Sequence, residues 1–177
     1  MVGVEAGFDL PDKEEKAVAV DYFLKIDGIP GESRDAKHKE EIEVLSWSWG
    51  ESAVGQPGTG SGAGAGKVQF QDFHFTSLIS KASPKLMEAC ASGKHLKNAV
   101  LTARRAGGGN VEFLTFALSD VLVTSYQTGG TESETAPVDS AALKFSQIRV
   151  EYRVMRPDGT LGSPVKFGWD SAKNKKL

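Results

Sequence analysis

The chain has 177 residues, of which 25% are charged and 40% hydrophobic, and its formal net charge is -2 at pH 7. These values are ordinary for a globular chain with one sizeable core, and the charge balance gives no electrostatic attraction to nucleic acid or to an anionic membrane. Cys90 is the single cysteine, which excludes an intramolecular disulfide and a metal site built from several cysteines.

The first residues are interpreted as a polar extension that precedes the fold. Residues 1–17 contain Pro11 and a charged run at 12–16, and they lack the basic start and apolar run of a secretory signal peptide. No stretch approaches the roughly 18 consecutive apolar residues that a spanning helix needs. We therefore expect an extension at 1–17, a single domain at 18–177 and no membrane insertion.

Period-two patterns predict strands in the first part of the domain. Residues 18–26 alternate, with Tyr22 and Leu24 on one face and Asp21 and Phe23 on the other. A turn rich in glycine and proline follows, and then a charged loop, ESRDAKHKEE.

A second strand is predicted at 41–50, where the alternation changes phase. Its central side chains divide between two faces: Leu45, Trp47 and Trp49 on the core side, Ser46 and Ser48 on the other. Ile42 and Val44 lie on the opposite parity, which predicts a β-bulge near Val44 and Leu45.

A glycine-rich stretch, GTGSGAGAGK at 58–67, ends in lysine as a phosphate-binding loop does. A Walker A loop needs a glycine where Ser61 stands and a hydroxyl where Val68 stands. The dinucleotide-binding glycine pattern does fit, but it requires the glycines to open a helix, and here a period-two strand follows. We therefore expect a loop between strands and no nucleotide or other cofactor.

The next segment, KVQFQDFHF, predicts one strand with a second bulge. Ser83 as N-cap and Pro84 at the first helical position predict a helix that Gly93 ends. Its apolar stripe contains Leu86, Met87 and Cys90.

The rest of the chain predicts further strands: a hairpin at 98–120 with a glycine-rich tip, its continuation to 128, a long strand at 143–155 and a short last one at 164–170. Seven or eight strands with one helix predict a mainly β fold, a small antiparallel β-barrel or two-sheet sandwich with one short α-helix.

No catalytic or metal-binding constellation is predicted. The three histidines lack metal-ligand spacing, so we interpret His38 as a loop residue, His74 as a strand residue and His95 as a partner of the helix C-terminus. Cys90 on the helix stripe is interpreted as a packed small side chain. Arg104 and Arg105, beside the hairpin tip, fit a solvated turn or a subunit contact rather than a nucleic-acid patch. A hydrolase built from distant carboxylates remains a minor alternative.

An ordered set of segments resembles the haemolysin-coregulated protein (Hcp) family, the tube subunit of bacterial type VI secretion systems. The segments are VDYFLKIDGIPGES, HKEEIEVLSWSWG, GKVQFQDFHF, SPKLMEACASGKH, LSDVLVTSYQTGG, LKFSQIRVEYRV and GWD. The resemblance covers about residues 18–170, and residues 1–17 are additional to the usual start of the family.

The resemblance implies a β-barrel with a helix beside it, a non-enzymatic role and assembly into hexameric rings. The rings stack into a tube that is surrounded by a contractile sheath, capped by a spike protein and exported with effector proteins in its lumen. The protein would then reside in the bacterial cytoplasm before firing and leave it without a Sec signal peptide.

The resemblance also assigns positions to the contacts between subunits. The loop at 51–66 is similar to an extended family loop that reaches neighbouring subunits or rings. We place interface residues there and at the arginine pair: Glu51, Ser52, Gly58, Gly60, Gly62, Gly64, Gly66, Arg104 and Arg105. Ser46 and Ser48 are predicted to face the lumen, with an ordinary solvated strand face as the alternative. An extracellular effector or binding module that uses the extension or the loop at 51–66 is the alternative function.

Overall fold

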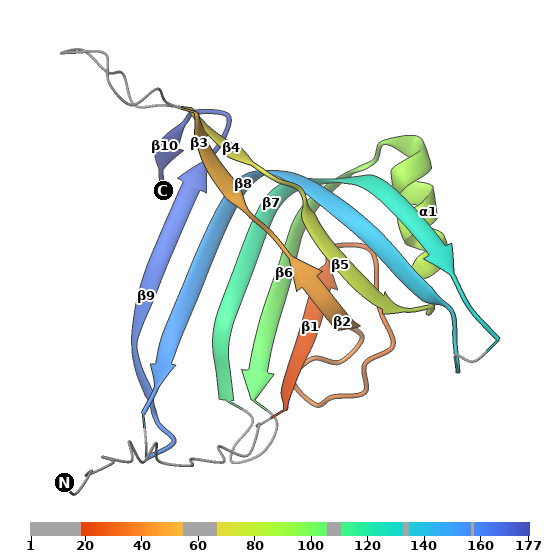
Figure 1. The fold of residues 1–177 in the computed structure, drawn as a ribbon, viewed down its shortest axis with the longest axis horizontal. Coiled ribbons are helices and arrows are strands. Elements are labelled where there is room, and N and C mark those ends of the chain that lie inside the picture. The colour runs from red at the N-terminus through yellow and green to blue at the C-terminus, as the bar shows by residue number, and fades with distance from the viewer. Residues whose placement is uncertain (1–18, 55–66, 106–110, 133–134, 157) are drawn as a thin grey trace, which may run out of the picture.

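The structure, a computed structural model, describes residues 19–54, 67–105, 111–132, 135–156 and 158–177 (Figure 1). Within these residues the chain forms strands and one helix, each with the following bounds: β1 Val20–Ile26, β2 Ile42–Ser48, β3 Glu51–Val54, β4 Lys67–Phe70, β5 Phe73–Leu78, α1 Ser83–Ser92, β6 His95–Arg105, β7 Val111–Gly129, β8 Val138–Met155, β9 Leu161–Asp170 and β10 Lys175–Lys176.

Six antiparallel strands close into a barrel. Their order is β8-β5-β2-β1-β6-β7, and β7 pairs back with β8 to complete the circle. The long strand β8 makes this closure possible because it changes partner along one edge, pairing with β5 at 138–143 and with β9 at 147–155. β9 and β10 therefore extend the sheet outside the barrel (Figure 1). The mainly β barrel with one short helix that the sequence predicts is confirmed.

Aromatic side chains fill the centre of the barrel. Phe73 is fully buried, and its ring stacks against Trp47 with centroids 5.8 Å apart. Phe116 lies 5.0 Å from Trp47 by the same measure. Trp49 is half-buried and packs on Phe116 as well. The predicted core positions of the two tryptophans are thus confirmed.

The bulge in β2 lies where the sequence predicts it. The register between β2 and β5 shifts between Val44 and Ser46, so Leu45 is the additional residue of the bulge. Its side chain is exposed, unlike the buried Val44. The prediction that Leu45 shares a face with Trp47 is therefore wrong, because the phase changes one residue later than the sequence pattern indicates.

The segment predicted as one bulged strand at 67–75 is two strands. β4 pairs with β3 in a separate two-stranded sheet, whereas β5 belongs to the barrel. The chain passes from β4 to β5 at Gln71, whose backbone N–H donates to the Gly50 carbonyl at 2.9 Å. β3 and β4 together form an arm that leaves the barrel (Figure 1), and part of the predicted loop at 51–66 is therefore strand.

The predicted helix is present with a different N-terminus. Ala82 occupies the N-cap position, and Gly93 ends the helix with φ of 64° as predicted. The Ser83 hydroxyl does not cap the helix, because it donates a hydrogen bond to the buried carboxylate of Asp139 on β8. This contact fixes α1 to the barrel. Along the described chain, no helix has the length and apolar character needed to cross a membrane.

Candidate assembly surfaces

The outer face of β2 and β5 carries small polar side chains around Ser46 and Ser48. Ser46 and Ser48 are both exposed on this face, as predicted from their alternation with the tryptophans. Ser46 Oγ lies 2.7 Å from Thr76 Oγ1 on β5, and Ser48 is opposite His74. This face offers hydroxyl groups to solvent, together with the larger exposed side chains of His74 and Leu78 on β5. The lumen-facing role of the two serines stays a prediction.

The β3–β4 arm carries the described part of the predicted contact loop. Glu51 and Ser52 are exposed in β3, opposite Phe70 and Gln69 of β4. The remaining loop positions lie outside the described residues: Gly58, Gly60, Gly62, Gly64 and Gly66.

Aromatic packing anchors the base of the arm to the barrel. The Phe70 ring lies 5.7 Å from Trp49 and 5.8 Å from Phe145, measured between centroids. Because Trp49 also packs on the core residue Phe116, the arm and the barrel share one continuous aromatic cluster. This packing fixes where the arm leaves the barrel.

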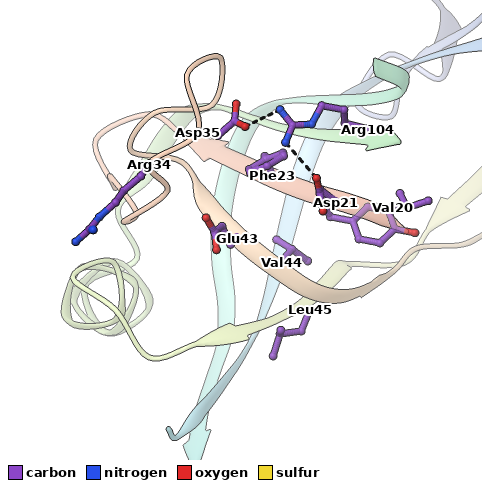
Figure 2. A pocket seen from close by; sticks show the side chains of 10 residues that line it. Val20, Asp21, Phe23, Arg34, Asp35, Glu43, Val44, Leu45 and Arg104 are labelled. Atoms are coloured by element: carbon purple, nitrogen blue, oxygen red, sulfur yellow. Dashed lines mark hydrogen bonds and ion pairs between the residues drawn. The ribbon is translucent and has the colours of Figure 1, made fainter. Parts of the chain in front are cut away.

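Arg104 at the end of β6 holds the loop between β1 and β2 against the barrel wall (Figure 2). Its Nη1 donates to Asp35 Oδ2 in the loop at 2.7 Å, and its Nη2 donates to Asp21 Oδ2 on β1 at 3.1 Å. The guanidinium also lies over the Phe23 ring, 4.8 Å from its centroid. We call this group of four residues the Arg104 latch.

Electrostatics favours the charged form of the latch. Burial works against the cation of Arg104, which is only 5% exposed, but the hydrogen bonds to Asp35 and Asp21 outweigh it and raise the pKa of the guanidinium. The hydrogen bond from Arg104, together with the Lys37 backbone N–H, lowers the pKa of the Asp35 carboxyl. Arg104 therefore acts inside this chain and has little surface left for a neighbour, whereas Arg105 is exposed.

His38 also packs on the Phe23 ring. The two rings are stacked with centroids 4.2 Å apart, and His38 Nδ1 lies 2.9 Å from Glu41 Oε2. Phe23, which the alternation of β1 places on the outer face, is buried because this loop covers it. The charged composition of the loop does not reveal this packing. The one signal for it in the sequence is the aromatic residue His38 within this charged loop.

Gly31 is required where the loop starts, because a side chain there would collide with the backbone. A Cβ atom on Gly31 would lie 2.3 Å from the Glu41 carbonyl oxygen. We expect Gly31→Ala to displace the loop and lower the free energy of unfolding by about 1–3 kcal/mol, the usual cost of overpacking. Chemical denaturation measures this, with Gly28→Asn as control: Gly28 has φ of 83° and open space around it, and asparagine tolerates such backbone angles. Equal losses in the two variants would contradict the steric argument.

The latch also predicts a dependence of stability on acid. Because folding lowers the pKa of the Asp35 carboxyl, its contribution is present above the unfolded pKa of about 3.9 and is lost as the pH falls through the lower folded value. We expect Asp35→Asn to be less stable than the unchanged protein at pH 7 and to lose less further stability between about pH 4 and 2. Denaturation midpoints across this range test it, and parallel curves for the two proteins would contradict it.

A cavity of about 580 Å³ opens beside the latch on the outer surface. Besides latch residues it is lined by Arg34, Glu43 and Leu45, which project from the loop and from the bulged strand β2 (Figure 2). Two exposed side chains of opposite charge beside an exposed leucine suit contact with a protein surface more than chemistry on a small molecule. The part of the chain that the structure describes holds no group of three or more metal-binding side chains.

The remaining histidines and the cysteine occupy simple environments. His74 is exposed on β5, as predicted for a strand residue. His95 is the first residue of β6, where its Nδ1 lies 2.9 Å from Asp120 Oδ1. Its partner is therefore Asp120 rather than the helix C-terminus. Cys90 is half-buried against the core, in agreement with a packing role.

Comparison with known proteins agrees with this architecture. Residues 23–152 match the family model described as "Type VI secretion system effector, Hcp". The chain is 49% identical over 159 residues to protein hcp1 of Pseudomonas aeruginosa, covering 89% of this chain and 98% of that protein.

Solved structures show the same fold. Hcp1 from Salmonella typhimurium is 39% identical with a TM-score of 0.77, and the match covers 90% of this chain and 99% of that one. A structure described as a type six secretion system protein is 29% identical with a TM-score of 0.84, covering 90% and 100% of the two chains. The chain forms a closed barrel, a family model matches most of the domain, and the match to relatives covers nearly their whole length. The chain therefore belongs to the Hcp family of type VI secretion systems.

Proposed function

We propose that this chain is a structural subunit of the type VI secretion inner tube, which assembles into hexameric rings that stack and are exported. The observation that carries the proposal is the 49% identity to an Hcp protein over nearly the whole length of both chains. Its partners are then other copies of itself, the spike protein, the contractile sheath and effector proteins. The subunits are in the bacterial cytoplasm before the sheath contracts, and they then leave the cell without a Sec signal peptide.

The two ends of the barrel wall supply different surfaces, which a ring requires. In a head-to-tail ring each subunit presents two complementary patches, and the ring closes when the rotation between neighbours fits. Arg105 and the exposed strands around it lie at the end of the barrel where β1 begins, while the β3–β4 arm leaves from the opposite end (Figure 1). The arm is the natural element to reach a neighbouring subunit or the next ring.

The polar outer face of β2 and β5 suits the lumen. Ser46 and Ser48 give a wall of small hydroxyl groups, and Thr76 continues it on β5. Small hydroxyl side chains bury little apolar area on contact, so this part of the wall lets cargo pass without strong adhesion. The effector proteins of the system are the cargo that this wall would meet.

Light scattering and electron microscopy of the purified protein test the ring. We expect a particle of six times the 18.9 kDa of one chain and annular images. A mass that stays monomeric across protein concentrations would contradict ring formation and favour the second candidate, a secreted effector or binding module on the same fold. The description of the matching family as an effector is the observation that favours this alternative.

A cysteine on the arm tests its contact separately. Ser52→Cys in a Cys90→Ser background places a single thiol on exposed β3. We expect intersubunit crosslinks in assembled protein with a short reagent that joins this thiol to an amine on a neighbouring chain. Lys85→Cys on the exposed face of α1 is the matched control for random collision. Crosslinks no more frequent than in this control would remove the arm from the assembly contacts.

A further inference from the structure

Exposed apolar side chains form a patch on the sheet that extends outside the barrel. Three side chains on β8 and β9 are exposed by 43%, 65% and 37%: Tyr152, Val165 and Phe167. Tyr152 pairs with Val165 across the two strands, and both lie on the side of the sheet that carries the core residue Ile148. This side thus continues the barrel interior beyond the barrel. We call the three exposed residues the β8–β9 apolar face.

A second apolar patch lies on β2 and β5, in a cavity of about 390 Å³ on the outer surface. Its exposed apolar side chains are Leu45, Leu78 and Ile79, with exposures of 54%, 45% and 44%. Leu45 projects from the β2 bulge (Figure 2). Ile79 follows the last residue of β5, and its backbone N–H donates to the Pro137 carbonyl at 3.0 Å. We call these three residues the β2–β5 apolar groove.

The two patches are separated along β8. Leu78 pairs with Val138 and Val165 pairs with Tyr152. The strand path between residues 138 and 152 is about 45 Å, at about 3.3 Å per residue. Figure 1 shows β9 at one edge of the molecule and the end of β5, beside α1, at the opposite edge. The patches therefore cannot cover each other within one chain, but they can do so between copies.

The size of the patches suits a contact between copies. Three side chains that are about half exposed leave on the order of 250 Å² of apolar surface on each patch, so the two areas match. An interface that buries about 800 Å² per partner has an apolar centre of this order with a polar rim around it. A head-to-tail contact needs two different patches that fit each other, and these two are of that kind.

Charges beside the two patches are complementary. Arg105 contacts Met155 Sδ at 3.4 Å, close to the β8–β9 apolar face, and forms no ion pair within the described residues. At the groove, the carboxylates of Glu32 and Glu43 outnumber the guanidinium of Arg34. Glu43 is exposed and has no hydrogen-bonding or ion-pair partner in the described part of the chain. A cation at one patch and a surplus carboxylate at the other favour contact between unlike patches.

We propose that the β8–β9 apolar face of one subunit packs into the β2–β5 apolar groove of the next copy around the ring. Val165 and Phe167 then fill the groove, and Arg105 faces Glu43 of the neighbouring copy. The contact lies at the end of the face that carries Ser46, so the walls of neighbouring copies meet there. This proposal rests on the ring proposed above and adds the two surfaces that hold neighbours together.

Crosslinking between two thiols tests the contact. Val165→Cys and Leu78→Cys together, in a Cys90→Ser background, place one thiol on each patch. With a short reagent that joins two thiols, we expect covalent products that grow by one chain at a time and end at the six chains of a closed ring. The yield should be at least about tenfold above that of a Val165→Cys and Lys85→Cys control, because contact holds the thiols at high local concentration. Each single variant should give no products.

Light scattering before the reagent is added distinguishes this contact from the ring itself. A six-chain particle with no more crosslinking than the Lys85→Cys control would overturn the contact and leave the ring proposal standing. A monomeric unchanged protein would overturn both proposals. Crosslinks in Val165→Cys alone would mean that like patches meet, and products larger than six chains would place the contact between rings. Either result would overturn the head-to-tail contact.

A second pair of thiols guards against a variant that fails to assemble. Tyr152→Cys with Ile79→Cys lies on the same two patches and should give the same products. If both pairs lose the six-chain particle while the Lys85→Cys control and the far-UV circular dichroism are unchanged, the substituted side chains hold the ring, which supports the contact. If both pairs keep the particle and neither crosslinks above the control, the contact is overturned.

Discussion

Replacing Arg104 with methionine is expected to lower the free energy of unfolding by about 2–3 kcal/mol. Removing one partner of a buried ion pair costs about 3–5 kcal/mol, and we expect less here because Asp21 and Asp35 keep contact with water. The variant leaves these two carboxylates facing each other and removes the cation over the Phe23 ring. Urea denaturation at one fixed protein concentration, followed by tryptophan fluorescence, measures the loss.

The adjacent Arg105 provides the matched control. Its guanidinium is exposed and contacts only Met155 Sδ among the described residues, at 3.4 Å. We expect Arg105→Met to change stability by no more than about 0.5 kcal/mol, as for other surface positions. Equal losses in the two arginine variants would show that the latch contributes nothing beyond ordinary surface charge.

The difference between these arginines illustrates what the sequence could not reveal. Two consecutive arginines beside a hairpin tip have the same local pattern, so the sequence predicts a turn or contact residue at both positions. The partners of Arg104 lie 69 and 83 residues away in the chain, at Asp35 and Asp21. A buried ion pair of this kind depends on tertiary packing, which local spacing does not encode.

Elements set by local chemistry were predictable. The alternation in β1, the phase change in β2 and the glycine that ends α1 each follow from backbone geometry over a few residues. The arm was not predictable, because a phase change between Phe70 and Phe73 is equally compatible with a bulge and with a change of sheet. Only the pairing of β4 with β3 distinguishes the two.

The candidate surfaces also include some features that the sequence predicts and others that it does not. The exposure of Ser46 and Ser48 follows from alternation with the tryptophans, and the structure confirms it. Their position in a lumen depends on neighbouring copies, so it remains a proposal. The Phe23–His38 stack is not predictable from the sequence, because a charged loop predicts solvent exposure, whereas this loop packs on the barrel through one aromatic pair.

Replacing Phe73 with alanine is expected to cause the largest loss of stability, about 3–5 kcal/mol. Phe73 is fully buried at the start of β5, where its ring contacts Trp47 and Phe116. The deletion leaves a cavity between three strands of a closed barrel, and a closed barrel relaxes poorly because each strand is held on both edges. Denaturation at fixed concentration measures the loss, and a shift in tryptophan fluorescence, to which Trp47 beside the cavity contributes, accompanies it.

Phe73→Leu separates the effect of volume from that of aromatic stacking. Leucine keeps most of the apolar volume, so we expect a loss of about 1–1.5 kcal/mol, as for hydrophobic exchanges of similar size. If Phe73→Leu lowers the free energy of unfolding as much as Phe73→Ala does, the stack on Trp47 rather than filled volume holds β5 in the barrel. If Phe73→Ala lowers the free energy of unfolding by less than about 1 kcal/mol, the core collapses around the missing ring. That result would contradict the rigid closure of the six strands.

Because β5 also carries His74 and Thr76 on its outer face, a displaced β5 would distort the polar wall proposed for the lumen. Ring formation should then weaken together with stability.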